Sequence, residues 1–311
     1  MVSNSEQSTA SPGLLASSDS AQNTSIWENL TASKPCIWLS KSALVSKCTH
    51  KMYLSTIQTL GEFANFEHPM PSSFSEIVKS LTTESTAKES MRTGLIFYNG
   101  VVVKRAPLDE PLNMLFVRHH TKVPVPGVLG IGPDYFIMDE IQGKQLVWDD
   151  TCDKDKVLAQ LRDYLAQVHA LKATDLGNHE RVCRVYHGRD FEGKCETLQD
   201  FHKLCVSKVT PRISQPFKEH LEISLGSSYD INFCHGDLAL ENILVDSDSN
   251  ITAIIGWEHA GFYPEYWDYV RILRTNIWKT DWPNRMREVM RPYDALSYVH
   301  RILEMFSRSR K

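Results

Sequence analysis

The chain has 311 residues, of which 42% are hydrophobic and 23% are charged, and its formal net charge is -4. These values are typical of a globular protein with one large domain or two lobes. The small negative charge argues against nucleic acid or an anionic membrane as a partner, and no apolar run is long enough to cross a bilayer. The seven cysteines form no CxxC pair, which indicates reduced thiols rather than disulfides or a zinc site. We therefore expect a cytoplasmic protein.

The chain divides into four segments of different character. Residues 1–25 are rich in Ser, Thr, Ala, Gln and Asn, carry no signal-peptide pattern and are predicted to be disordered. Residues 26–92 contain short apolar patches without strong periodicity, which indicates an irregular, partly helical cap. Stronger patterns then predict a sheet lobe at 93–142 and a helical lobe at 143–311.

The sheet lobe opens with a predicted β-hairpin at 95–103. Two apolar runs flank Asn99-Gly100, and an Asn-Gly pair supplies the positive φ angles that a tight turn requires. Asp109 can cap the short helix that follows, and residues 135–138 read as a further strand.

The helical lobe shows a different periodicity. From about residue 153, apolar residues recur at three- and four-residue spacing, as in an amphipathic helix. A second such stripe runs from Met286 to Phe306 and is interrupted by Pro292. Strands first and helices later predict an α+β protein with two lobes, and the cleft between two lobes is a natural site for a small molecule.

The residues His235-Gly236-Asp237, followed by Asn242 and an apolar run, have the spacing of a kinase catalytic loop. In that chemistry the aspartate orients and deprotonates an acceptor hydroxyl, and the asparagine holds a metal ion on the nucleotide phosphates. The alternative is that His-Gly-Asp is only a turn.

The next segment favours the catalytic interpretation. Two apolar runs between residues 243 and 255 flank a polar loop and predict a β-hairpin. In the expected register residue 242 faces residue 255, so residue 256 emerges beside Asn242. A second metal ligand belongs at that position.

The region from about 95 to 300 resembles the aminoglycoside phosphotransferase-like family, and its fungal members in particular. Those proteins typically read HGDL-x-x-x-N-I-L-V-D and then I-I-D-W-E-x-A-G-F-Y-P-E-Y-W, which correspond to 235–246 and 254–267 here. The resemblance extends upstream through Val103-Lys104 and a hinge-like segment at 136–143. It implies a protein kinase-like two-lobed fold and transfer of phosphate from ATP, with Mg²⁺, to a small-molecule hydroxyl.

The resemblance also implies a nucleotide site. Lys104 would hold the phosphates and pair with Glu110, whereas the alternative for Lys104 is a solvated lysine at a strand end. Asp139 and Glu140, in the hinge, would offer backbone groups to the adenine ring.

For the catalytic loop the resemblance implies a base, a brace and a metal ligand. Asp237 would be the catalytic base and Asn242 a magnesium ligand. His235 either braces the loop by hydrogen bonds or acts with Asp237 as acid and base. Asp268 is expected to be a buried brace.

The chain departs from the family pattern at the metal-binding aspartate, which is Gly256 here. Loss of that carboxylate argues against ordinary kinase activity, because phosphoryl transfer depends on electrostatic stabilisation. Phosphotransfer survives if Glu258, Asp246 or Asp248 supplies the carboxylate; otherwise Glu258 has only a structural role.

Two further functions stay open. One is a pseudokinase that binds a ligand or partner without transferring phosphate. The other is a repurposed kinase fold with different chemistry, for example in a specialised-metabolite pathway. The insert around 174–230 that should line the acceptor pocket has no recognisable signature. The acceptor and the oligomeric state are not indicated by the sequence.

Overall fold

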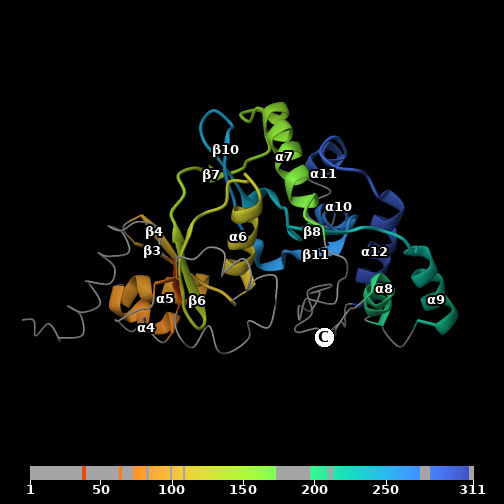
Figure 1. The fold of residues 1–311 in the computed structure, drawn as a ribbon, viewed down its shortest axis with the longest axis horizontal. Coiled ribbons are helices and arrows are strands. Elements are labelled where there is room, and N and C mark those ends of the chain that lie inside the picture. Colours follow the sequence, from red (N-terminus) through yellow and green to blue (C-terminus); the bar gives the residue numbers. More distant parts are fainter. Residues whose placement is uncertain are drawn as a thin grey trace, which may run out of the picture.

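The computed structural model describes residues 73–81, 84–98, 100–107, 109–172, 197–207, 209, 213–273 and 281–307, and the backbone of 37–39 and 63–64. The predicted disordered segment 1–25 and much of the predicted cap lie outside this part. Figure 1 shows a sheet lobe, in orange and yellow, and a helical lobe, in green to blue, with helix α6 (Asp109–His120) between them. The predicted α+β fold with two lobes is confirmed. None of the described helices combines the length and apolar character of a membrane span.

The sheet lobe is built on six strands in the order β2-β1-β5-β6-β4-β3. These strands are β1 (Ile37–Leu39), β2 (Phe63–Ala64), β3 (Leu95–Tyr98), β4 (Val101–Arg105), β5 (Val128–Ile131) and β6 (Tyr135–Asp139). Strands β3, β4, β6 and β5 pair antiparallel, while β1 pairs parallel with both β2 and β5. The lobe also carries α4 (Phe74–Leu81) and α5 (Glu84–Thr93).

The hairpin predicted at 95–103 is present. Tyr98 pairs with Val101, and Gly100 has a φ angle of +80°, which glycine adopts without steric cost. By contrast, the segment predicted as a cap at 26–92 does more than cover the lobe. It contains α4 and α5, but β1 and β2 also extend the sheet.

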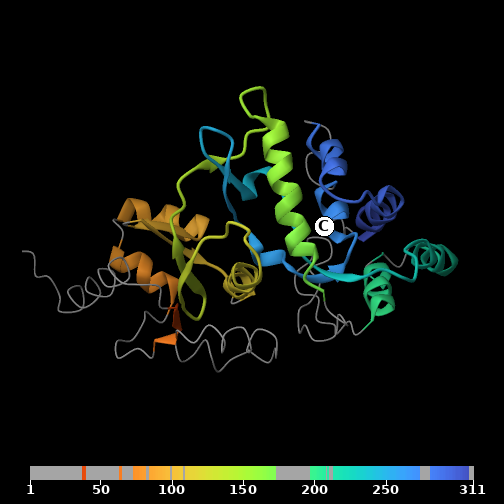
Figure 2. The ribbon, with the colours of Figure 1, turned by 45° about the horizontal axis from the view of Figure 1, so that its top comes forward.

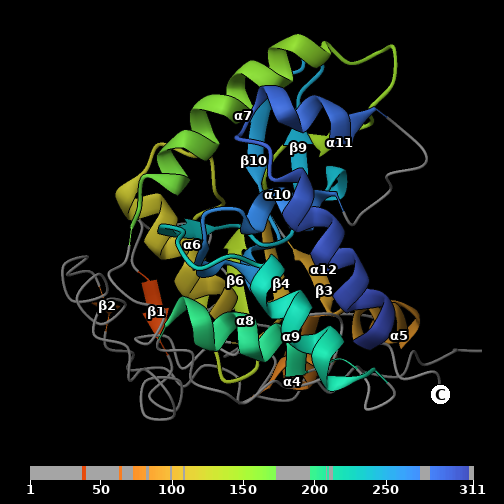
Figure 3. The same cartoon turned by 90° about the vertical axis from the view of Figure 1, so that its right-hand side faces the viewer.

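The helical lobe contains the remaining elements. They are β7 (Lys144–Gln145), α7 (Lys154–His169), α8 (Leu198–Ser207), α9 (Gln215–Ser224), β8 (Ile231–Cys234), η1 (Leu240–Asn242), β9 (Ile243–Val245), β10 (Ile251–Ile254), η2 (Trp257–His259), β11 (Gly261–Pro264), α10 (Trp267–Ile272), α11 (Trp282–Arg285), η3 (Met286–Glu288) and α12 (Asp294–Ser307). In Figure 2, α7 runs along this lobe beside α11. Figure 3 shows α8, α9 and α12 together at the end of the helical lobe that faces the viewer.

The predicted long helix of this lobe is α7. The side chain of Asp153 accepts a hydrogen bond from the amide of Lys156 at 3.0 Å, which caps its first turn. Its apolar stripe is buried throughout, at Val157, Leu158, Leu161, Leu165 and Val168. The second predicted stripe forms η3 and α12, separated around Pro292.

Two small antiparallel sheets place the loop that contains Asp237. Strand β8 pairs with β11, and β9 lies between β10 and β7. The chain from 235 to 242 joins β8 to β9, and the chain from 255 to 260 joins β10 to β11. The two connections therefore meet, and they contain the residues that the sequence singled out.

Candidate active site

The loop after β8 turns sharply at Gly236. Its φ angle is +78°, and a Cβ atom there would lie 2.3 Å from the carbonyl oxygen of His259. Both the backbone conformation and this close approach require glycine. The turn directs the next residue, Asp237, away from the buried strand.

Asp268 holds this turn from the buried side. Its Oδ2 accepts the amide of His235 at 3.1 Å, and its Oδ1 accepts the amide of Gly236 at 2.7 Å. His169 Nε2 lies 2.9 Å from Oδ2. Burial alone would raise the pKa of Asp268, but the His169 contact and the Gly236 amide hold it below its ordinary value of 3.8. Asp268 is a buried, ionised brace for the loop, in agreement with the sequence.

His235 is fully buried and uses both of its ring nitrogens. Nε2 lies 2.9 Å from the carbonyl oxygen of Ile255, and Nδ1 accepts the amide of Asp237 at 3.2 Å. These contacts place the ring proton on Nε2, and burial lowers the pKa of the imidazole. Of the two roles the sequence left open, the geometry favours bracing over acid–base chemistry.

The side chain of Asp237 is 31% exposed, and two donors flank its carboxylate. Asn242 Nδ2 donates to the backbone carbonyl of Asp237 at 2.8 Å and lies 3.4 Å from Oδ2. On the other side, Arg271 Nη2 lies 3.6 Å from Oδ1. Arg271 was not predicted from the sequence, although it follows Asp268 by one helical turn on α10.

Lys104 and Glu110 form an ion pair, with 2.8 Å between Nζ and Oε1. Glu110 is buried, and its Oε2 has no hydrogen-bond partner among the described residues. Burial raises the pKa of Glu110 even though the adjacent Lys104 ammonium opposes the shift. Because its ammonium is bound to a buried carboxylate, Lys104 is not simply a solvated strand-end lysine.

The hinge backbone is already engaged at two positions. The amide of Asp139 donates to Gly127 O at 2.9 Å, and the amide of Glu140 donates to Gly100 O at the same distance. The Asp139 carboxylate also accepts the Gly127 amide at 3.1 Å. The two amide groups therefore already have acceptors, and the expectation that these residues offer backbone groups to adenine stays a prediction.

The hairpin β9–β10 brings residue 256 to Asn242, as predicted. The amide of Ile255 donates to Asn242 O at 2.9 Å, so residues 242 and 255 face each other. Gly256 then adopts a φ angle of +78°, and a Cβ atom there would lie 2.6–2.8 Å from the Asn242 carboxamide atoms. Asn242 fills the space beside position 256.

Glu258 lies in η2 (Trp257–His259), after the turn at Gly256. Gly256 turns the chain out of the strand into η2, so Glu258 does not continue along a strand face. Its Oε1 lies 3.3 Å from Nε2 of His259. Its charge raises the pKa of Glu110, although burial raises it more.

Asp246 and Asp248 lie at the turn of the hairpin, at the opposite end from Gly256. The Asp246 carboxylate accepts the amides of Asp248 and Asn250 at 2.9 and 2.8 Å. Asn242 is thus the one predicted ligand that the structure places against position 256. The described residues do not supply the set of carboxylate oxygens that Mg²⁺ favours.

A buried asparagine joins helix α6 to this site. Asn113 Nδ2 donates to the carbonyl oxygens of Trp257 at 2.7 Å and Ala260 at 3.1 Å, and the asparagine is fully buried. Asn113 therefore fixes η2 to the helix that carries Glu110. This contact was not predicted from the sequence.

The model of the phosphotransferase enzyme family matches residues 111–296 of the chain, which is more than half of its length. The chain belongs to this family. The matched region contains Asp237, Asn242 and Asp268, whereas Lys104 and Glu110 lie just before it. No curated protein sequence matches the chain significantly.

Solved structures of kinase-like phosphotransferases are similar to the chain at low identity. An aminoglycoside-3'-phosphotransferase of type VIII is 18% identical, with 66% of this chain and 84% of that chain covered and a TM-score of 0.41. A thermostable mutant of aminoglycoside phosphotransferase APH(4)-Ia is 19% identical, with 68% and 78% covered and a TM-score of 0.46. Choline kinase LicA from Streptococcus pneumoniae is 13% identical, with the same coverage and a TM-score of 0.42.

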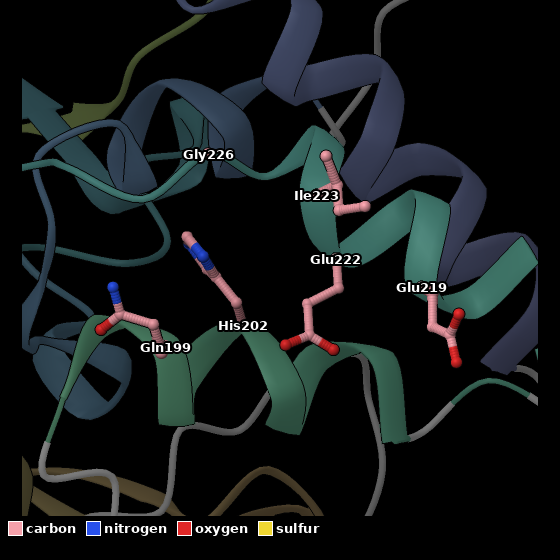
Figure 4. Close-up of a pocket in the computed structure, with 6 residues that line it drawn as sticks. All are labelled: Gln199, His202, Glu219, Glu222, Ile223 and Gly226. Carbon is pink, nitrogen blue, oxygen red and sulfur yellow. The ribbon is translucent and has the colours of Figure 1, made fainter. Parts of the chain in front are cut away.

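In this phosphotransferase-family chain a separate cavity of about 400 Å³ lies between α8 and α9, within the insert around 174–230 (Figure 4). Its described lining residues are Gln199, His202, Glu219, Glu222, Ile223 and Gly226. His202 Nε2 lies 2.8 Å from the hydroxyl of Tyr266, and burial lowers the pKa of this histidine to about 4. The imidazole is therefore neutral, and the charged lining groups are the two glutamates.

Proposed function

We propose that the chain transfers phosphate from ATP to a hydroxyl group of a small molecule, with Asp237 as the base. The observation that carries this proposal is the partly exposed Asp237 carboxylate, which directly follows the buried residues His235 and Gly236. His235 and Asp268 are fully buried and hydrogen-bonded within the protein, whereas the Asp237 carboxylate beside them is open to a ligand.

The distances around Asp237 suit a base. Its oxygens lie 3.4 Å from Asn242 Nδ2 and 3.6 Å from Arg271 Nη2, both longer than a good hydrogen bond. The carboxylate is therefore oriented but keeps lone pairs for an acceptor hydroxyl. The proton of the acceptor hydroxyl passes to Asp237 while the hydroxyl oxygen forms a bond to the γ-phosphorus of ATP. The bond between the γ-phosphorus and the bridging oxygen of the β-phosphate breaks, and ADP leaves.

Lys104 supports the nucleotide part of the proposal. Its side chain is 24% exposed while its ammonium is fixed by the buried Glu110. A lysine held in this way offers a positive charge to phosphate groups without a large loss of side-chain entropy on binding. In this family Mg²⁺ would neutralise phosphate charge, but since the ligand set does not fit that ion we assign it no step.

A second function is favoured by the region around Gly256. Position 256 offers no ligand, and Asn242 fills the adjacent space. A pseudokinase with this arrangement would bind its ligand without turnover. The repurposed acid–base alternative has less support, because His235 has no ring nitrogen left for a substrate.

Calorimetry and turnover assays on the wild type and Asp237→Ala test the proposal. We expect millimolar ATP to bind both proteins with Mg²⁺, and a screen of hydroxyl acceptors to show turnover that the substitution lowers by about 10²–10⁴-fold. Asp163→Ala removes an exposed carboxylate on α7 that bonds only to Gln167 in the described structure, and it should keep wild-type turnover.

The alternatives give different results. Ligand binding without turnover in the wild type, unchanged by Asp237→Ala, would support the pseudokinase. Absence of ATP binding at millimolar concentration would exclude phosphotransfer. Turnover of a small molecule that requires Asp237 but no nucleotide would support the repurposed fold.

A further inference from the structure

Arg271 is a nearly buried cation beside the proposed base. It lies on the short helix α10, and its side chain is only 7% exposed. Its Nε donates to the carbonyl oxygen of Gly236 at 2.7 Å, while Nη2 faces Asp237 Oδ1 at 3.6 Å. One guanidinium group thus contacts both the backbone before Asp237 and the Asp237 carboxylate.

Asp268 and Arg271 both form hydrogen bonds with the backbone of Gly236. Asp268 Oδ1 accepts the amide of Gly236, and Arg271 Nε donates to its carbonyl. The two side chains stand one helical turn apart, so a rigid element sets both contacts. The direction in which the chain enters Asp237 is therefore fixed by α10.

The carboxylate itself lies between two donors from different elements. Asn242 approaches Oδ2 and Arg271 approaches Oδ1. A guanidinium is planar, and its donors have fixed directions, so the Nε bond to Gly236 also determines where Nη2 points. The charge opposite Oδ1 is consequently placed by the backbone contact rather than by a flexible chain.

We propose that Arg271 is a positioning residue that sets the orientation of the Asp237 carboxylate towards the acceptor hydroxyl. This inference rests on the proposed function, because it assigns the orientation to phosphoryl transfer. Arg271 does not touch the reacting atoms. It acts by holding Gly236 and by attracting Oδ1, which leaves the remaining lone pairs of Asp237 aimed out of the loop.

The test compares Arg271→Gln and Arg271→Lys with the wild type, using MgATP with water as the acceptor. Arg162→Gln is the matched control, because Arg162 Nε also donates to a backbone carbonyl, that of Glu288 at 2.8 Å, on an exposed face. We expect Arg271→Gln to lower kcat for hydrolysis by about ten- to hundred-fold while KM for ATP stays within about two-fold. Arg271→Lys, which keeps the charge, should recover part of kcat, and the control should keep all of it.

A crystal structure of Arg271→Gln, or of Arg271→Lys if the first variant does not fold, gives an outcome independent of turnover. We expect the Asp237 carboxylate to leave its place between Asn242 and residue 271, or to occupy more than one rotamer. An unchanged carboxylate, or kcat within about two-fold of wild type, overturns the inference. If the wild type hydrolyses no ATP but the carboxylate moves, Arg271 still positions Asp237 and only the phosphotransfer proposal fails.

Discussion

The two sides of the candidate site differ in how completely their groups are engaged. On the bracing side, the backbone groups of His235 and Gly236 are bonded by Asp268 and Arg271, and both ring nitrogens of His235 have backbone partners. On the ligand side, formed by Asn242, Gly256 and Glu258, one position has no side chain and one carboxylate faces a histidine.

This difference separates two requirements of phosphoryl transfer. The bracing side determines where the base stands, and the ligand side would determine how phosphate charge is neutralised. Asp237 has orienting contacts on the bracing side, whereas position 256, where the sequence resemblance implies a metal-binding carboxylate, is a glycine. The predictions below test whether the two sides are also energetically distinct.

The largest effect is expected on the bracing side, for Asp268→Ala. This change leaves the amides of His235 and Gly236 and the ring of His169 without their acceptor. Each buried polar group left unsatisfied costs about 1–3 kcal/mol, so we expect a loss of about 3–5 kcal/mol by urea denaturation. The exposed control Asp163→Ala should change stability by less than about 0.5 kcal/mol. A loss near the control value would show that the brace is not structurally important.

The Asp268 carboxylate should also make the free energy of unfolding fall at acid pH. The pKa of Asp268 lies below its ordinary value of 3.8 in the folded protein, because its hydrogen bonds outweigh burial. A depressed pKa contributes stability above the unfolded value, and this contribution is lost as pH falls through the folded value. In Asp268→Asn, thermal unfolding between about pH 5 and pH 2 should depend less on pH than in the wild type. An equal dependence of the melting temperature on pH in the two proteins would contradict this prediction.

Local patterns were sufficient to predict much of the fold. The hairpin at 95–103 and helix α7 depend on neighbouring residues, through turn chemistry and helical periodicity. Strands β1 and β2 were not predicted, because each is at most three residues long and β1 pairs with β5 about ninety residues away. Such a pairing depends on tertiary contacts, which strand propensity does not encode.

The candidate site divides in the same way. Hairpin spacing placed Asn242 opposite residue 255, and the family resemblance placed Asp268 against the loop. Spacing did not show that Gly256 turns the chain into η2, so it did not place the Glu258 carboxylate. Asn113 was missed because its two bonds span more than 140 residues.

A smaller effect is expected for Asn113→Ala, which tests the contact of helix α6 with Trp257 and Ala260. The substitution leaves the carbonyl groups of Trp257 and Ala260 without this donor, at a cost of about 2–3 kcal/mol. Because α6 also carries Glu110, affinity for ATP should fall together with stability. Asn284→Ala, on an exposed face of α11, is the control and should change neither quantity. A loss of stability without any change in affinity for ATP would show that the Asn113 contact does not influence the nucleotide site.

On the ligand side, Gly256→Ala can be compared with Gly100→Ala. The two glycines have nearly the same φ angle, +78° and +80°, but a Cβ atom meets Asn242 at position 256 and nothing within 4 Å at position 100. Both changes should cost about 1 kcal/mol for the backbone, and Gly256→Ala about 1 kcal/mol more for overpacking.

Asn242→Ala should remove that additional cost in the double variant, because the crowding atoms are those of its carboxamide. Equal costs for Gly256→Ala with and without Asn242 would show that only the backbone matters there. The comparison uses denaturation of the four variants in a double-mutant cycle.

The smallest effect is expected for Glu258→Gln. Its carboxylate faces His259 at 3.3 Å, and Asn242 rather than Glu258 fills the space beside Gly256. Affinity for ATP measured by calorimetry should therefore change by less than about two-fold, with or without Mg²⁺, since a screened contact of a partly exposed carboxylate contributes little. Glu258→Asp keeps the charge and should behave in the same way.

If the glutamine variant instead loses a Mg²⁺-dependent part of the affinity that the aspartate variant keeps, Glu258 supplies the missing carboxylate. The ligand side would then be rebuilt from a different residue rather than lost, and phosphotransfer would be favoured over the pseudokinase.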